Sequence, residues 1–304
     1  MPHKKDLNVT IAGHTFSNPI MPASGTYDYF ENNVNCFPMS ELGAIMIKSV
    51  HRECRPGNPP QRIVEVTGGM LNAVGIPSVG IEDFVKNELK KYENIGTSVV
   101  LSIAGSQIEH YAECLEILGD NPIVNAVEMN LSCPNVGTGL AFSLDSEVLI
   151  ETVSKARSKT KLPLFVKLAP NITDIRVTAK ASEDAGADAI TVANTWRGMV
   201  IDIDKQKPVL GNTSGGMSGP AIKPQTMYQV WQASTVVNIP IIASGGVARW
   251  QDAVEYFLAG ASMVQVGSAN FADPECMVKI IDGIDDYLSD NGYESIYEII
   301  GAAH

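Results

Sequence analysis

The 304-residue chain is 45% hydrophobic and 18% charged, which is enough apolar sequence for one large core and excludes a disordered protein. Its net charge of −12, with no lysine or arginine cluster, argues against a nucleic-acid-binding protein. No apolar run approaches the roughly 18 residues of a membrane span, and the N-terminus has neither a signal-peptide run nor an amphipathic anchor, so no membrane attachment is expected.

Short apolar runs alternate with helical patterns along the chain, which is typical of a parallel α/β fold. In chain order, we expect strands at residues 19–22, 44–48, 98–103, 124–130, 164–168, 189–193, 240–243 and 263–266. Between them we expect helices at residues 81–92, 108–118, 147–159, 175–185, 224–236 and 250–258. Eight such strands favour a TIM (β/α)₈ barrel, as a single domain over residues 1–304, over an open doubly wound sheet.

Two smaller features complete the predicted barrel. A hairpin at about residues 7–16 is expected to plug its bottom. Four acids near the C-terminus, Asp282, Asp285, Asp286 and Asp290, indicate a solvated helix face.

Three connections, at residues 50–80, 131–144 and 195–220, are too long for simple strand-to-helix loops. They contain apolar residues besides Gly, Pro and Asn, so we expect them to be ordered. Each follows a strand, and would therefore lie at the C-terminal face of the barrel, where such enzymes have their active sites.

Polar and small residues end the predicted strands, whereas the strand interiors are expected to be Val, Ile, Leu and Ala. Two glycine turns, "ASGGVARW" and "QVGSANF", follow the last two strands and suit a phosphate, although tight turns need glycine in any case. Lys48 and Lys167 each end an apolar strand. Two lysines in one barrel mouth favour a bound anionic cofactor or substrate, the alternative being that they reach back to solvent.

Cysteine and histidine usage bears on metal and redox chemistry. The five cysteines are an odd number without a CxxC pair, which favours a reducing compartment, expected to be the cytoplasm. Cys114 and Cys276 are expected to be inert packing, whereas Cys133 lies in a polar loop where a thiol could act as a base. The five histidines show no pair at metal-ligand spacing, so no metal site is predicted.

Several segments together resemble the dihydroorotate dehydrogenases, most closely the FMN-binding catalytic subunits of class 1B. The resemblance covers the chain from about Asn18 to the end and is carried by "GMLNAVGIPSVG", "MNLSCPNVGTG", "FVKLAPNITDI", "VANTWRGM", "GGMSGPAIKP", "IIASGGV" and "AGASMVQVGSANF". It implies oxidation of (S)-dihydroorotate to orotate in pyrimidine (UMP) biosynthesis. Cys133 would take the proton from C5, and a hydride would pass from C6 to the flavin.

The resemblance also implies roles for individual residues. Positions matching FMN contacts are Ser24, Lys48, Ser49, Ser102, Asn130, Lys167, Ala193, Gly219, Gly245, Gly246, Gly267 and Ser268. Positions matching substrate contacts are Lys48, Asn72, Ala73, Val74, Gly75, Ile76, Asn130, Asn135, Asn194 and Thr195. Three positions depart from the family pattern, namely Ser78, Ser102 and Trp196.

The electron acceptor depends on the class to which the chain belongs. Class 1B implies a partner subunit with FAD and an iron–sulfur cluster, NAD as final acceptor, and a homodimer core within a heterotetramer. The chain itself has no nicotinamide fingerprint and no iron–sulfur cysteine spacing. Alternatives are a fumarate-dependent class 1A enzyme, a pyrimidine reductase like the domain of dihydropyrimidine dehydrogenases, and a catalytically silent flavin- or phosphate-binding scaffold.

Overall fold

Eight parallel strands form the central sheet of the computed structural model, which describes residues 4–30, 36–132 and 142–304. In spatial order they are β3 (Ile20–Pro22), β16 (Met263–Val266), β15 (Ile241–Ser244), β10 (Ala189–Val192), β9 (Leu164–Lys167), β8 (Ala126–Asn130), β7 (Ser98–Ala104) and β4 (Ala44–His51). All correspond to predicted strands, and β4 continues past its predicted end at Lys48 to His51.

The two end strands of this order, β3 and β4, also meet. The Gly43 amide donates to the Ile20 carbonyl at 3.0 Å, and the Ser49 amide donates to Ser24 Oγ at 2.9 Å. The sheet therefore closes on itself, and the fold is a TIM (β/α)₈ barrel.

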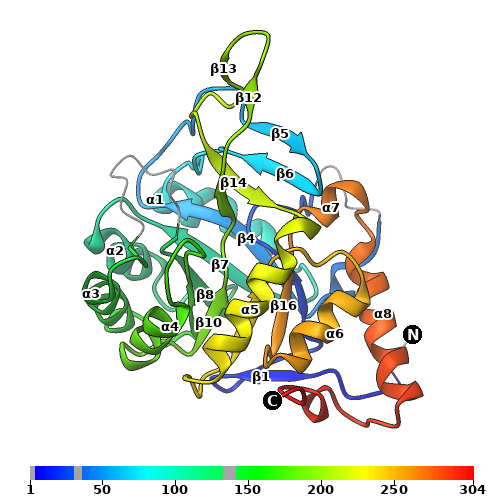
Figure 1. Ribbon diagram of the computed structural model, residues 1–304. Coiled ribbons are helices and arrows are strands. Elements are labelled where there is room, and N and C mark those ends of the chain that lie inside the picture. Colours follow the sequence, from blue (N-terminus) through cyan, green and yellow to red (C-terminus); the bar gives the residue numbers. More distant parts are fainter. Residues whose placement is uncertain (1–3, 31–35, 133–141) are drawn as a thin grey trace.

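Helices cover the outside of the barrel (Figure 1). The longer ones are α2 (Ile108–Leu118), α3 (Ser146–Arg157), α4 (Ile175–Asp184), α5 (Lys223–Ser234), α6 (Trp250–Leu258) and α8 (Cys276–Asp290). Asp145 and Asp174 cap α3 and α4 by accepting backbone N–H groups, which explains where these two helices begin. Among the described residues, no helix is long and apolar enough to cross a bilayer.

Shorter helical turns fill the connections: α7 (Ala269–Ala272), η1 (Met39–Glu41), η4 (Pro220–Ile222) and η5 (Ile296–Glu298). The predicted helix at residues 81–92 is divided into α1 (Ile81–Asp83), a π-helical segment η2 (Phe84–Glu88) and a 3₁₀ segment η3 (Leu89–Tyr92).

One prediction for α8 is wrong in part. Asp285 is 6% exposed rather than solvated, and its two carboxylate oxygens accept the backbone N–H groups of Lys4 and Lys5, each at 2.9 Å. This carboxylate attaches the N-terminal segment to the helix.

An antiparallel hairpin of β1 (Val9–Ile11) and β2 (His14–Phe16) lies at the bottom of the barrel (Figure 1). Phe16 is fully buried and its ring lies 6.3 Å from that of Phe165 inside the barrel. His14 Nε2 lies 2.9 Å from Ser98 Oγ at the start of β7. The hairpin thus covers the N-terminal ends of the barrel strands.

A four-stranded antiparallel sheet lies over the opposite end, and we call it the canopy. Its order is β11 (Trp196–Gly198), β14 (Gly215–Ser218), β6 (Gly69–Asn72) and β5 (Ile63–Val66). It joins two of the long connections, because Gly216 on β14 pairs with Asn72 on β6. A small hairpin of β12 (Ile201–Asp202) and β13 (Lys207–Pro208) projects beyond it (Figure 1). The prediction that these two connections are ordered is thereby confirmed. Most of the third connection, residues 133–141, lies outside the described residues.

Candidate active site

A cavity of about 870 Å³ lies between the barrel mouth and the canopy, a size typical of small-molecule sites. The carboxyl ends of the barrel strands form its floor, and β5, β6 and β14 contribute its roof. Most of the residues predicted from the sequence line it, namely Ser24, Lys48, Ser49, Asn72, Val74, Gly75, Ile76, Asn130, Lys167, Ala193, Asn194, Thr195, Gly219, Gly245, Gly246, Gly267 and Ser268.

Four of the predicted residues are not among those lining residues. Ser102 is fully buried behind Ser49, and the two hydroxyl oxygens lie 2.7 Å apart. Ala73 is buried with Leu71 and Leu210 in a small core of the canopy. Cys133 and Asn135 lie outside the described residues.

Amide side chains form a connected row on the floor. Asn194 Nδ2 donates to Ser132 Oγ at 2.7 Å and to Asn130 Oδ1 at 3.2 Å. Asn130 Nδ2 in turn donates to Ser49 Oγ at 3.2 Å, and the Thr195 amide donates to Asn194 Oδ1 at 2.7 Å. These bonds fix the orientation of the amides, whose side chains carry both donor and acceptor atoms.

Lys48 is an accessible cation in the cavity wall. Its ammonium donates to the Pro77 carbonyl at 2.8 Å and has no carboxylate partner among the described residues. Desolvation by the surrounding wall, and the nearby charge of Arg62, lower the pKa of Lys48 below its ordinary value. An anionic ligand group would offset both effects.

Lys167 is different, because the protein supplies its counter-ion. The ammonium donates to Gln265 Oε1 at 2.7 Å and lies 3.5 Å from Glu128 Oε1. Glu128, Thr191 and Gln265 are buried inside the barrel, so the prediction of purely apolar strand interiors is wrong. The lysine alone is therefore weaker support for a bound anion than the sequence indicated, since Glu128 already balances its charge.

The glycine turns bring bare backbone to the cavity. Gly219 and Gly246 have φ of 110° and 70°, a left-handed region that side chains rarely adopt. A Cβ on Gly246 would lie 2.8 Å from Lys223 Cβ, and one on Gly219 would lie 2.5 Å from Gly69 Cα. Glycine is thus required at both positions.

The two buried cysteines predicted to be packing residues are indeed buried. Burial raises the pKa of the Cys114 thiol and of the Cys276 thiol to about 12 each. Cys276 touches the cavity, but its thiol donates to Asn270 Oδ1 at 3.2 Å. Neither is suited to act as a base near neutral pH.

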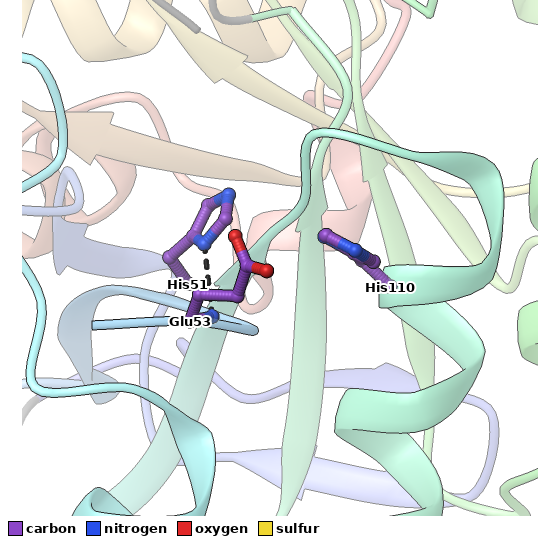
Figure 2. Close-up of side chains that lie close together, drawn as sticks. All are labelled: His51, Glu53 and His110. Atoms are coloured by element: carbon purple, nitrogen blue, oxygen red, sulfur yellow. Dashed lines mark hydrogen bonds between the residues drawn. The ribbon is translucent and has the colours of Figure 1, made fainter. Parts of the chain in front are cut away.

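A histidine pair that the sequence spacing did not reveal lies near the end of β4. Figure 2 shows His51, His110 on α2 and the Glu53 carboxylate, which offer ligand atoms within 4.8 Å of one another. His51 Nδ1 accepts the Glu53 amide at 3.0 Å, and Nε2 lies 2.9 Å from Ser106 Oγ. Because Nδ1 is an acceptor, the proton of the neutral ring is on Nε2, and no lone pair remains for a metal.

The electrostatics around His51 agree with this reading. Burial, the charge of Arg55 and His110 lower the pKa of His51 to about 4. A positive guanidinium beside the cluster also opposes a cation, and we assign no metal to it.

Comparison with known proteins gives the family. Residues 6–288 match the model of the family described as "Dihydroorotate dehydrogenase". Three curated relatives are each named "Dihydroorotate dehydrogenase B (NAD(+)), catalytic subunit". They come from Geobacter sulfurreducens (46% identical over 300 residues), Geotalea uraniireducens (44% over 300) and Bacteroides fragilis (44% over 298), and in each case 98% of both chains is covered.

The chain belongs to the dihydroorotate dehydrogenase family.

Within this family, the departures noted in the sequence have local structural explanations. Ser78 Oγ accepts the backbone N–H groups of His51 and Gly80, at 3.0 and 3.1 Å. Trp196 belongs to β11, and its indole N–H donates to Thr226 Oγ1 at 3.4 Å. Both side chains hold long connections in place around the cavity.

Proposed function

We propose that this protein oxidises (S)-dihydroorotate to orotate in pyrimidine biosynthesis, with FMN as its cofactor and NAD as the final electron acceptor. The observation that carries the proposal is the single cavity that combines an amide row, an accessible lysine and two glycine turns under the canopy. The family match and the names of the relatives support the same reaction.

The residues present fit FMN. Gly245, Gly246, Gly267 and Ser268 offer backbone at the ends of β15 and β16, the position of the phosphate site in many barrels. Lys167 offers an ammonium on the floor that would stabilise negative charge on a reduced ring. When bound, FMN would supply the two-electron acceptor for the hydride from C6 of the substrate.

The substrate fits the remaining groups. Asn72, Asn130 and Asn194 provide the alternating donors and acceptors that a pyrimidinedione edge requires, and Thr195 adds a hydroxyl. Lys48 would bind the carboxylate. We assign the base to Cys133 on the family motif "NLSCPN", because a thiol whose pKa is lowered can take up a proton near neutral pH.

We also propose a partner. The names of the relatives include "catalytic subunit", which supports a second subunit that carries the electrons to NAD. FAD, an iron–sulfur cluster and a heterotetramer built on a homodimer of this chain would complete the assembly. The described cysteines are all free thiols, which supports a reducing compartment such as the cytoplasm.

A visible spectrum of the purified protein tests the function. A flavin spectrum with near-stoichiometric FMN, bleached by anaerobic dihydroorotate, is expected. FAD, or no flavin after reconstitution, would remove the cofactor assignment, and an unbleached flavin would support a silent scaffold. Tighter binding of orotate than of uracil separates this enzyme from a dihydropyrimidine dehydrogenase-like reductase.

A further inference from the structure

Four polar side chains meet inside the barrel beneath the cavity, and we call them the floor cluster. They are Glu128 on β8, Lys167 on β9, Thr191 on β10 and Gln265 on β16, with exposed fractions of 0, 5, 0 and 1%. Only Lys167 of the four lines the cavity. Glu128 and Gln265, the two that contact Lys167, can therefore act on a ligand only through that lysine, whereas Thr191 hydrogen-bonds to Glu128.

The hydrogen bonds of the cluster are directional. Gln265 accepts from the Lys167 ammonium at 2.7 Å and donates through Nε2 to Glu128 Oε2 at 2.6 Å. Thr191 Oγ1 donates to the same Glu128 oxygen at 2.9 Å. Glu128 Oε1 receives no hydrogen bond from a described residue and faces the ammonium at 3.5 Å.

This arrangement leaves donor capacity at the cavity. The Lys167 ammonium has three N–H donors, and one of them donates to Gln265. Glu128 acts as its counter-ion from outside the cavity lining. A ligand at the floor therefore experiences the attraction of the Lys167 ammonium, partly cancelled by the Glu128 carboxylate behind it. Because all four side chains are buried, solvent screens these two charges less than it would screen exposed charges.

We propose that Gln265 and Glu128 are positioning residues that set how strongly Lys167 acts on the ring of bound FMN. Gln265 fixes the ammonium at the cavity floor, and Glu128 attenuates its charge. The inference rests on the proposed function, because it takes the flavin as the ligand beside Lys167. The barrel interior thereby tunes the reduction potential without touching the cofactor.

The proposal assigns opposite signs to two isolated changes. Glu128→Gln removes the counter-ion and keeps the side-chain size, so the negative reduced flavin is stabilised and the midpoint potential rises. Gln265→Leu removes the acceptor that holds the ammonium, so Lys167 moves toward Glu128 and the potential falls. Thr191→Val removes one hydrogen bond to Glu128 and no charge, and is the matched control.

The experiment measures the midpoint potential of FMN-loaded holoenzyme by equilibration with a reference dye, without dihydroorotate. Each of the two shifts is expected to reflect about a tenfold change in the relative affinity for reduced and oxidised FMN, or about 30 mV for a two-electron couple. Thr191→Val should stay near the wild-type potential while its thermal unfolding temperature falls. Melting curves for all variants report on folding separately.

A purely structural floor cluster would lower stability in every variant and leave the potential unchanged or shifted in one direction, and either result overturns the inference. If Glu128→Gln does not fold, the midpoint potentials of Gln265→Leu and Thr191→Val still test the inference, since only Gln265→Leu should lower the potential. A wild-type protein that binds no FMN overturns the proposed function and the inference together. Normal reduction by dihydroorotate with unmoved potentials overturns the inference alone.

Discussion

Cys133 is the residue whose substitution should separate binding from chemistry. Cys133→Ala is expected to bind FMN and orotate normally but to slow flavin reduction by dihydroorotate about 10²- to 10⁴-fold, the usual contribution of a general base. Stopped-flow absorbance under anaerobic conditions measures this rate. Cys133→Ser should also be slow near neutral pH, because a hydroxyl is far less acidic than a thiol. Wild-type reduction kinetics in Cys133→Ala would assign the base elsewhere.

Lys48 should give the reaction an alkaline limit. Its ammonium is charged below its pKa and neutral above it, and this pKa lies below the ordinary value of 10.5. The kcat/KM for dihydroorotate, whose carboxylate needs the charge, should therefore fall at a lower alkaline pH than an ordinary lysine would give. Lys48→Met should lower kcat/KM about 10- to 100-fold, as expected for a lost charge-assisted hydrogen bond, and abolish the alkaline fall.

The exposed Lys207 on β13 provides the control for this profile. Lys207→Met keeps Lys48 and should retain the wild-type pH dependence. Persistence of the alkaline fall in Lys48→Met would show that another group titrates there.

For individual residues, the sequence predicted which side chains line the cavity better than it predicted the hydrogen-bond and ion-pair partners of those side chains. Lys48 and Lys167 were both predicted at strand ends, and both line the cavity, although β4 continues beyond Lys48 to His51. Glu128 was missed because it lies within an otherwise apolar run, although one acid inside a strand is itself a signal of a buried charge pair. The contact of His51 with His110 depends on β4 and α2 packing together, which no local spacing encodes.

Among the elements, the turn after β15 is the one most sensitive to a single methyl group. Gly246→Ala would place Cβ 2.8 Å from Lys223 Cβ and 2.9 Å from the Lys223 backbone nitrogen, at a φ of 70°. We expect weaker FMN binding, measured by fluorescence titration. We also expect a free energy of unfolding about 1–3 kcal/mol lower than that of a variant with the backbone strain alone.

Gly292 supplies that reference variant. It has a φ of 77°, but an added Cβ would meet nothing within 4 Å. Gly292→Ala therefore has a comparable conformational cost without the collision, and should bind FMN normally. Equal stability and equal FMN affinity in the two variants would contradict a steric requirement at Gly246.

The barrel strands were predictable and two of the canopy strands, β6 and β14, were not, for a physical reason. The barrel strands are short apolar runs buried on both faces, which is a strong local signal. The strands β6 and β14, "GMLN" and "GGMS", have glycines and no β-branched residue. They become strands because Gly216 and Asn72 meet across the mouth, a pairing set by tertiary structure.

The complete enzyme requires a route for electrons out of the cavity. We expect the isolated chain to reduce artificial dyes with dihydroorotate but to reduce NAD poorly, because its sequence has no nicotinamide fingerprint. Adding the proposed partner subunit should restore NAD reduction, followed by absorbance at the NADH band. Efficient fumarate reduction by the isolated chain would overturn the class 1B assignment and leave the barrel, FMN and Cys133 unaffected.

The closure of the barrel has a consequence for the chain during its synthesis. The first barrel strand, β3, hydrogen-bonds to the last, β16, which ends at Val266 of the 304 residues. Until that strand has left the ribosome, β3 has an open edge that could pair with another nascent chain. The strand is only three residues long, and Pro19 and Pro22, which have no N–H to donate, stand at its two ends. The sequence thus makes β3 a poor template for aggregation before β16 has been synthesised.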